Sequence, residues 1–493
     1  MKLPRVSTKR LLEVIPGATV WFALIAPVVL SSVAPAVVAI FILLFDLYWL
    51  YKALIMGVHL LAGYRRMSHD VKQDWRARAG QAAGQIYHVV ILTTYLEPEG
   101  VIAKSLESIR VADYPQNRLV VVLATEEREG AIAQEKAARL KKIYGKRFAE
   151  FLVTVHPDGI AGERKAKGAN ATWAAKRLSV WAKRRGIKPE DILVTTADAD
   201  TRFHKQYFAC LTHHYAAAGK PTRSSYQPIP IYANNIWQAP ALSRILAFGS
   251  SFWQLIESTR PWRLITFSTH AMSLKTLQEI NYWDVTVINE DSRQFWRAYF
   301  AFRGDHRVVP IFVPVYMDAV LTDTYLGTLQ HQYQQRLRWA YGAEHFPYVV
   351  ISSFKHPEIP LLDRLAKVYR LFEANFSWAT ASIFLAFVGW IPLILNREFS
   401  ETVLGHNVPI FTSRILSLTW LGLAISAVIA LRLLPPKPPG VRRATALMMV
   451  LQWILTPISA LVFGSIPAID AQTRLMLGRP FGFWTTAKKA INI

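Results

Sequence analysis

The 493-residue sequence predicts an α/β domain, with a doubly wound parallel sheet, inserted between transmembrane helices. Three observations predict this fold class. Uncharged apolar runs gather at both ends of the chain, β-rich runs alternate with helical stretches in the middle, and charged residues are scarce. Hydrophobic residues make up 52% of the chain and charged residues 18%, whereas soluble domains carry about 25% charged residues. This composition excludes an intrinsically disordered chain and argues against a wholly water-soluble protein.

The charge and cysteine content narrow the classes of partner. The chain has 57 Lys and Arg against 34 Asp and Glu, which gives a net charge of +23. Such a charge fits nucleic acid, basic loops on the cytosolic side of a membrane, or a phosphate-rich substrate. Because the apolar runs lie at the two ends, we favour the last two and expect no nucleic-acid partner. The single cysteine, Cys210, excludes an internal disulfide and fits a reducing compartment.

Residues 1–67 are predicted to form an N-terminal membrane region with two transmembrane helices. From Gly17 to Tyr64 the only charged residues are Asp46 and Lys52, and one crossing needs about 20 residues. Basic residues on both flanks favour the cytosol for both ends, which a hairpin of two crossings satisfies better than one crossing plus an interfacial helix. A cleaved signal peptide is the alternative, but its apolar core usually spans only ~7–15 residues before a small-residue cleavage site.

Residues 347–493 are predicted to hold interfacial helices, about three membrane segments and a basic tail. The uncharged runs cover 374–396, 415–431 and 444–469. Three crossings from a cytosolic middle region would leave the tail outside, although its basic residues favour the inside. The last run contains Gln452 and the Thr456-Pro457 pair, so we expect a break there, as in a re-entrant hairpin buried in protein.

Residues 68–346 have the composition of a globular α/β domain. The β-rich runs cover 86–94, 119–125, 151–155 and 191–197. The helical stretches between and after them cover 102–112, 130–144 and 169–185. Near-continuous apolar strands that alternate with helices are typical of a parallel sheet covered on both faces. With strand order 3-2-1-4, ligands bind where the carboxyl ends of the first and fourth strands meet, so we expect the chemistry there.

The fourth strand ends in Asp198-Ala199-Asp200. Two carboxylates two residues apart can hold a divalent cation, which in turn can bridge a diphosphate. An isolated acidic pair is more often a solvated turn, and the place of this pair after a hydrophobic strand is what favours a site. No G-x-G-x-x-G follows the first strand, which disfavours a dinucleotide-binding dehydrogenase.

Two further motifs lie downstream: Glu290-Asp291, after an apolar run, and Q-x-x-R-W at Gln335, Arg338 and Trp339. The order D-x-D, E-D, Q-x-x-R-W, in an α/β domain between membrane spans, resembles the family 2 membrane glycosyltransferases of the processive polysaccharide synthase type, such as cellulose, chitin and hyaluronan synthases. The resemblance implies a cytosolic GT-A domain, Rossmann-like and doubly wound. It also implies an inverting, metal-dependent transfer of a sugar from a nucleotide-sugar, with a UDP-sugar expected, to a growing polysaccharide at the cytosolic face of the inner or plasma membrane.

The resemblance implies a role for each matching residue of this chain. The expected donor contacts are Thr94, Tyr95, Glu97, Glu126, Lys167, Asp198, Gln335 and Arg338. The expected ligands of Mg2+ or Mn2+ are Asp200 and Asp198. The expected catalytic residues are Asp291 as general base, Glu290 beside it, and Arg338 at the leaving diphosphate. The expected acceptor contacts are Trp339, Ser268 and Thr269.

The chemistry of the reaction supports these roles independently. Displacement at an anomeric carbon needs a base for the acceptor hydroxyl and positive charge for the departing diphosphate. Asp291 fits the first need, and Lys167 and Arg338 fit the second, because a guanidinium can bond two phosphate oxygens at once. We expect the like charge of Glu290 to raise the pKa of Asp291.

Several alternatives stay open. Trp339 also fits an interfacial anchor, and Glu290 and Asp291 also fit the start of a helix. Glu126 stands where many relatives carry D-D-G, which leaves the donor base open, and Phe267 stands where a glycine is expected near the acceptor. Single-sugar transfer to a lipid-linked or short acceptor is the main functional alternative, and a non-catalytic membrane scaffold is a remote one. The expected partners are the nucleotide-sugar, a glycan or lipid-linked acceptor and membrane lipids; a homo-oligomer and accessory subunits are left open.

Overall fold

The computed structural model describes residues 7–440 and 443–479, which fold into two compact units. The first unit comprises the described residues up to Leu61, Leu329–Arg432 and those from Pro439 onward. The second unit comprises Ala62–Thr328 and the short segment Leu433–Pro438. Two helices, α2 (Pro35–Asp70) and α11 (Tyr325–Ala340), contribute residues to both units.

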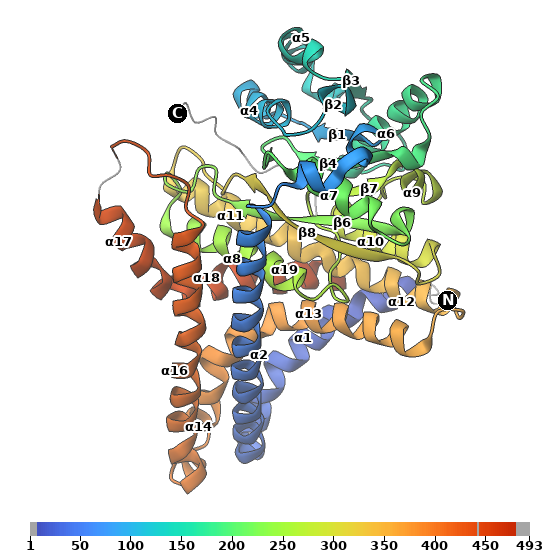
Figure 1. The fold of residues 1–493 in the computed structure, drawn as a ribbon. Helices are drawn as coiled ribbons and strands as arrows, with labels where there is room; N and C mark the ends of the chain where they lie inside the picture. The colour runs from blue at the N-terminus through green and yellow to red at the C-terminus, as the bar shows by residue number, and fades with distance from the viewer. Residues whose placement is uncertain (1–6, 441–442, 480–493) are drawn as a thin grey trace. The chain divides into compact units, whose positions relative to one another are not determined.

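The second unit is built on an eight-stranded mixed sheet of order β3-β2-β1-β4-β7-β6-β8-β5 (Figure 1). The strands are β1 (Tyr87–Thr93), β2 (Leu119–Glu126), β3 (Glu150–His156), β4 (Ile192–Asp198), β5 (Arg202–Phe203), β6 (Ser224–Tyr232), β7 (His270–Ser273) and β8 (Arg307–Met317). The first four strands are parallel, in the order 3-2-1-4 that the sequence predicts. β7 then pairs antiparallel with β4 and β6.

Helices connect these strands and cover the sheet. They are α3 (Trp75–Ala79), α4 (Glu99–Arg110), α5 (Ala131–Tyr144), α6 (Lys167–Arg184), α7 (Tyr207–Ala216), α8 (Ala241–Ser258), α9 (Leu274–Glu279) and α10 (Glu290–Ala301). The predicted helical stretches correspond to α4, α5 and α6. Local sequence explains the start of α4. Pro98 precedes this helix, and Glu99 places an acid at its amino end, where the helix dipole favours negative charge.

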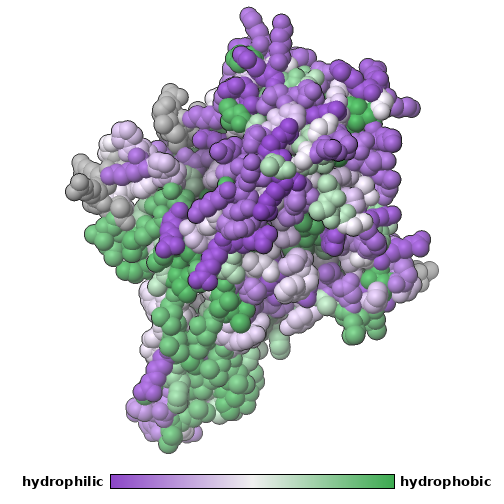
Figure 2. All heavy atoms as spheres, in the orientation of Figure 1, coloured by the Kyte–Doolittle hydropathy of each residue, from purple (hydrophilic) through white to green (hydrophobic). Residues whose placement is uncertain are grey.

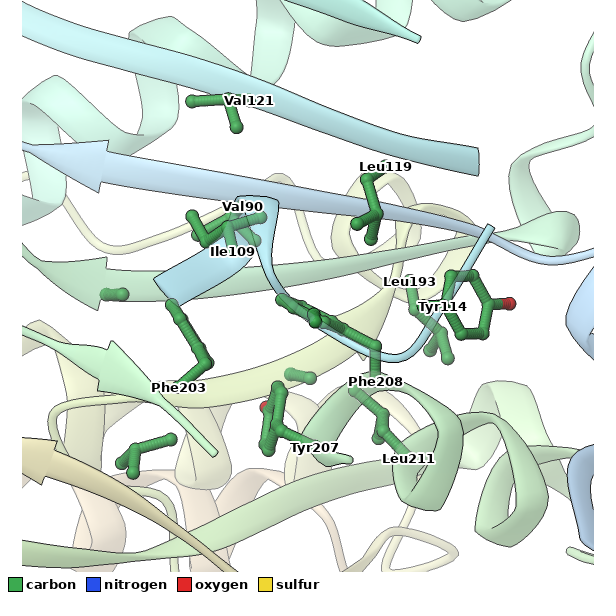
Figure 3. Close-up of a cluster of buried hydrophobic side chains, with 14 of the residues drawn as sticks. Val90, Ile109, Tyr114, Leu119, Val121, Leu193, Phe203, Tyr207, Phe208 and Leu211 are labelled. Atoms are coloured by element: carbon green, nitrogen blue, oxygen red, sulfur yellow. The ribbon is translucent and has the colours of Figure 1, made fainter. Parts of the chain in front are cut away.

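Each face of the sheet carries its own hydrophobic core. Along β1, Val90 and Leu92 belong to one cluster and Val89 and Ile91 to the other, because successive side chains of a strand point to opposite faces. The first cluster includes side chains of α4, α5 and α7, and Figure 3 shows part of it around Phe208. The second includes side chains of α6, α9 and α10. Burial on both faces is the reason why these strands read as uninterrupted apolar runs.

The first unit is helical in its described residues. Besides parts of α2 and α11 it contains α1 (Thr8–Val33), α12 (His345–Lys355), α13 (Leu361–Phe387), α14 (Ile391–Leu395), α15 (Arg397–Ser400), α16 (Val403–Arg432), α17 (Arg443–Leu451), α18 (Thr456–Ala460) and α19 (Ile466–Met476). Figure 2 shows hydrophobic side chains gathered on the surface of α2 and α16. Exposed leucines of these two helices include Leu44 and Leu47 on α2 and Leu418 and Leu421 on α16.

Five helical runs of the described chain are long and apolar enough to cross a membrane. They are Thr8–Val33, Pro35–Asp70, Leu361–Leu395, Val403–Arg432 and Leu447–Met476. The two charged residues of the N-terminal apolar stretch are paired with these helices. Asp46 accepts a hydrogen bond from the Thr412 hydroxyl (2.8 Å), and Lys52 forms an ion pair with Glu373 (2.5 Å). Pairing lowers the cost of charged groups inside an apolar bundle.

The break expected in the last apolar run takes a different form. Residues 443–476 stay helical, with a 3₁₀ turn over Gln452–Leu455 and a π-helical turn over Leu461–Ser465. The expected hairpin is therefore replaced by local changes of helix type at and just after the residues that predicted a break. Proline and inserted side chains are common causes of such irregular turns.

Candidate active site

The predicted site residues of the α/β domain gather at the carboxyl ends of β1, β2 and β4. Thr93, the last residue of β1, is paired in register with Ala124 of β2 and with Asp198 of β4. The loop after β1 and the D-x-D motif therefore start from neighbouring points of one sheet edge. This is the placement that parallel strands of order 2-1-4 require.

Glu97 shapes the loop that follows β1. Its carboxylate accepts hydrogen bonds from the Thr94 hydroxyl (2.9 Å) and from the backbone N–H of Tyr95 (2.6 Å). From α5, Lys136 donates to the carbonyl oxygen of Glu97 (2.9 Å) and forms a buried ion pair with Glu129 (2.5 Å). The three predicted donor residues of this loop thus lie in one hydrogen-bonded turn, held from outside by α5.

Glu126 ends β2 and lies beside this turn. Its carboxylate pairs with Arg128 (2.5 Å), whose guanidinium lies 3.9 Å from the centre of the Tyr95 ring. Glu126 also lines a concave pocket, open to solvent, together with His156, Asp158, Gly159, Glu163, Arg164 and Lys165. A pocket with charged and hydrogen-bonding walls suits a polar ligand.

Lys167 is the first residue of α6 and reaches the D-x-D motif. Its ammonium group donates to a carboxylate oxygen of Asp198 (2.7 Å) and lies 3.4 Å from the carbonyl oxygen of Ser268. Burial lowers the pKa of Lys167, but the charges of Asp198, Glu290 and Asp291 outweigh it and raise the pKa above its usual range. Lys167 is therefore a fixed positive charge.

The residue after Lys167 must be glycine for these elements to pack. A Cβ atom at Gly168 would lie 2.8 Å from the carbonyl oxygen of Asp284 and 2.9 Å from the Cβ of Glu290. Both distances are below normal contact. Gly168 thus lets the start of α6 approach the start of α10.

Ser268 connects the D-x-D motif to the E-D motif. Its hydroxyl donates to Asp198 Oδ2 (3.0 Å), and its backbone N–H donates to Asp291 Oδ2 (2.7 Å). Its φ of +37° lies in the left-handed region that L side chains rarely adopt. The structure therefore brings Lys167, Asp198, Ser268 and Asp291 together, although they are spread over more than a hundred positions of the sequence.

Asp291 is the second residue of α10. Its second oxygen, Oδ1, accepts a hydrogen bond from the backbone N–H of Ser292 (2.7 Å), and its carbonyl oxygen accepts one from the Thr266 hydroxyl (2.6 Å). A carboxylate at a helix amino end also interacts favourably with the helix dipole. The Asp291 carboxylate therefore both stabilises the start of α10 and belongs to the site, so these two interpretations do not exclude each other.

Glu290, the first residue of the E-D pair, has a raised pKa. Glu290 is 5% exposed, and burial, followed by the charge of Asp291, raises its pKa to about 8. We expected like charge to raise the pKa of Asp291. Burial, which the sequence does not show, is the larger cause and acts on Glu290.

The Glu290 carboxyl makes the stability of the domain depend on pH. A glutamate whose pKa rises from 4.5 to about 8 on folding binds a proton in the folded state that the unfolded state has lost. Stability therefore falls as the pH rises through that window, by at most about 1.4 kcal/mol per pH unit. We expect the thermal unfolding temperature of Glu290→Gln to fall less between pH 5 and pH 8 than that of the unmodified protein. Glu279→Gln, at an exposed acid of α9, should keep the original slope; equal slopes in all three proteins would refute this account.

Asp200 lies in the loop after β4 and is 3% exposed. Its Oδ2 accepts a hydrogen bond from the backbone N–H of Asp318 (3.1 Å), just after β8, and its carbonyl oxygen accepts one from Asn234 (3.2 Å). The described residues contain no group of three metal-ligating side chains. Asp198 and Asp200 would thus supply two carboxylates to a cation, with the remaining ligands from a diphosphate and water, a ligand set that suits Mg2+.

Thr269 follows Ser268 and is 1% exposed. Its hydroxyl lies 3.4 Å from that of Thr201. Its side chain is therefore directed into the protein, beneath the turn that carries Ser268.

Gln335, Arg338 and Trp339 lie on α11, in the part of the chain that belongs to the first unit. Gln332 donates to the side-chain oxygen of Gln335 (3.4 Å), and the Arg336 guanidinium lies 4.9 Å from the centre of the Trp339 ring. The donor and acceptor roles of this motif stay predictions.

Sequence reasoning missed two residues that contact the site, Gln227 and Asp318. Gln227 contacts it through its side-chain amide, and Asp318 through its backbone N–H. Gln227 is a buried amide on β6 that bonds both neighbours of Ser268, and Asp318 provides the N–H that binds Asp200. Gln227 had a weak signal, because its amide directly precedes the apolar part of β6. Asp318 had none, because its contribution is a backbone N–H.

The family model described as "Glycosyl transferase family group 2" matches residues 193–459, more than half of the chain. Among solved structures, the mannosyltransferase PcManGT from Pyrobaculum calidifontis, in complex with GDP-Man and Mn2+, is similar over 78% of this chain and 99% of its own. The two chains are 17% identical, with a TM-score of 0.42. No curated protein matches the chain.

Proposed function

The chain belongs to glycosyl transferase family group 2 and is a glycosyltransferase that uses a nucleotide-sugar, and we propose that it is an inverting, metal-dependent enzyme that extends a polysaccharide at the cytosolic face of a membrane. One observation carries the mechanistic part. Lys167, Asp198 and Asp291 meet around Ser268, so a fixed cation, a D-x-D carboxylate and a second carboxylate that can act as base share one site.

The proposed reaction is a single displacement at the anomeric carbon. The acceptor hydroxyl oxygen forms the new bond to that carbon while the bond to the diphosphate oxygen breaks, and the diphosphate leaves with the electron pair. Asp291 takes the hydroxyl proton. Its two oxygens accept backbone N–H bonds from Ser268 and Ser292, which orient the carboxylate. A single displacement inverts the configuration of the sugar.

Positive charge stabilises the leaving diphosphate. Lys167 supplies one full charge beside Asp198. Asp198 and Asp200 would hold Mg2+ or Mn2+, which supplies further positive charge to the diphosphate when bound. We assign Arg338 and Gln335 to the same diphosphate and Trp339 to the acceptor sugar, on their match to the Q-x-x-R-W motif.

We assign the nucleoside of the donor to the β1 loop and the pocket beside Glu126. Thr94, Tyr95 and Glu97 lie in the hydrogen-bonded β1 loop, and His156 and Arg164 line the pocket together with Glu126. The Arg128 guanidinium on the Tyr95 ring stiffens this loop. A UDP-sugar is the proposed donor.

The membrane part of the proposal depends on the five apolar helical runs. They indicate association with a membrane, and we propose a multi-pass protein whose α/β domain lies in the cytosol. Basic residues flanking the N-terminal apolar stretch favour this orientation.

The deciding experiment uses the full-length protein and a panel of UDP- and GDP-sugars. We expect one donor to release its nucleoside diphosphate only in the presence of Mg2+ or Mn2+, and the labelled product to grow into a long chain. Products that carry a single added sugar would instead favour transfer to a lipid-linked or short acceptor. Nucleotide release that is insensitive to chelation of the metal would contradict the metal-dependent mechanism.

A further inference from the structure

Gln227 is a buried amide that lies behind the candidate active site. It is 1% exposed on β6, and its side chain makes three hydrogen bonds. Its Oε1 accepts from the backbone N–H of Phe267 (2.8 Å), and its Nε2 donates to the carbonyl oxygens of Thr269 (3.0 Å) and Pro228 (3.0 Å). The Gln227 side chain thus holds the backbone on both sides of Ser268 by hydrogen bonds.

The sequence of β6 explains why a side chain performs this task. β6 and β7 pair antiparallel at Ser225–Met272 and Tyr226–Ala271, and the pairing stops there. The next residue but one on β6 is Pro228, which has no N–H to continue the ladder. The Gln227 amide offers one acceptor and two donors, and so replaces the missing ladder bonds to the segment before β7.

The segment that Gln227 holds has an unusual backbone conformation and contacts residues of the candidate active site. Ser268 has a φ of +37°, which a serine adopts only where its surroundings hold it. In this conformation its N–H reaches Asp291 Oδ2 and its hydroxyl reaches Asp198 Oδ2. If residues 267 and 269 moved, both contacts would be lost together.

We propose that Gln227 is a positioning residue that holds Ser268 in its left-handed conformation, and that it thereby sets Asp291 in line with the donor site. This inference rests on the proposed function, because it assigns Asp291 to proton removal. Gln227 itself touches no substrate. Its amide acts through the backbone of Phe267 and Thr269.

The proposal predicts which kinetic constant changes. Asp198 keeps its bond to Lys167 when the Ser268 contact is lost, so donor binding should change little. Asp291 loses an N–H that orients one of its two oxygens, so the chemical step should slow. A small misplacement of a reacting group can cost about 10²-fold in rate. We therefore expect Gln227→Met to lower kcat by about 10-fold or more, with the donor KM within about threefold of its original value.

Gln254→Met is a matched control, because Gln254 is a buried glutamine (3% exposed) on α8 that makes no hydrogen bond through Nε2 in the described structure. Both variants remove a buried amide from the same domain. We expect kcat of Gln254→Met to stay near the original value. Equal kcat values for the two variants, or parallel losses of kcat and donor affinity, would overturn the positioning role.

Amide hydrogen exchange tests whether Gln227 holds residues 267–269 in place, independently of enzyme activity. The N–H groups of residues 267 and 268 donate to Gln227 and Asp291, so the peptide 265–270 should exchange more slowly in the original protein than in Gln227→Met. If the methionine variant does not fold, Gln227→Glu tests the bond to Thr269 alone, because it keeps the acceptor for Phe267 and removes the donor to Thr269; exchange of the Ser268 N–H should then become faster. Unchanged exchange in the variant would refute the role of Gln227 in holding this segment, even if no sugar transfer were detected. Faster exchange in a protein that is inactive with every donor would count against the proposed function alone.

Discussion

Replacing Asp291 with Asn is expected to lower the rate of sugar transfer by about 10²–10⁴-fold while nucleotide-sugar binding persists. Asparagine has the shape of aspartate and can still accept the N–H of Ser268, but it cannot take up the acceptor proton. Lys167 and Asp198, which hold the donor side of the site, keep their ion pair. The rate is measured as release of the nucleoside diphosphate, and binding is measured by calorimetry.

Asp305→Asn is the matched control for this substitution. Asp305 lies after α10, its side chain is 56% exposed, and it pairs with Lys220 at the surface. We expect full activity from it. Turnover of Asp291→Asn at the level of this control would remove Asp291 from the role of base.

Replacing Asp200 with Ala is expected to weaken metal-dependent binding of the donor by on the order of 10²-fold. The substitution removes one of the two carboxylates that would hold the cation, while Lys167 still attracts the diphosphate. Calorimetric titration of the donor, with Mn2+ or Mg2+ and with a chelator, separates the two contributions. The difference between the two titrations should nearly vanish in the variant.

The loss of the Asp200 carboxylate also removes the hydrogen bond from the N–H of Asp318. Asp200→Asn keeps an acceptor for that N–H and should show the same loss of metal dependence at a higher unfolding temperature. Asp305→Ala should bind as the unmodified protein does. A metal-dependent difference that persists in both Asp200 variants would exclude Asp200 as a ligand.

The strands and helices of the α/β domain were predictable because its sequence signals are local. The runs that became β1, β2, β3 and β4 are apolar on both faces, and the structure confirms both their positions and their order in the sheet. The D-x-D and E-D motifs were identified for the same reason, since each is a short pattern next to a strand or helix end. The order of the motifs identified the family 2 glycosyltransferases, which the family match confirms, whereas the processive synthase type stays a prediction.

The contacts within the site could not be predicted. Ser268 was expected at the acceptor, but nothing local shows that its N–H and hydroxyl join Asp291 to Asp198. Gln227 is 41 positions away from Ser268, and its role depends on the end of the ladder between β6 and β7. The raised pKa of Glu290 was not predicted, because burial cannot be judged from charge spacing.

The sequence by itself determined the alternation of strands and helices, the apolar runs at both ends, and the types of reactive side chain, because periodicity and composition are properties of neighbouring residues. Only the tertiary structure decided which of those side chains meet. Hydrogen bonds and desolvation act over a few ångströms, and residues as distant in the sequence as Asp198 and Ser268 come within that range only when the sheet and helices have packed.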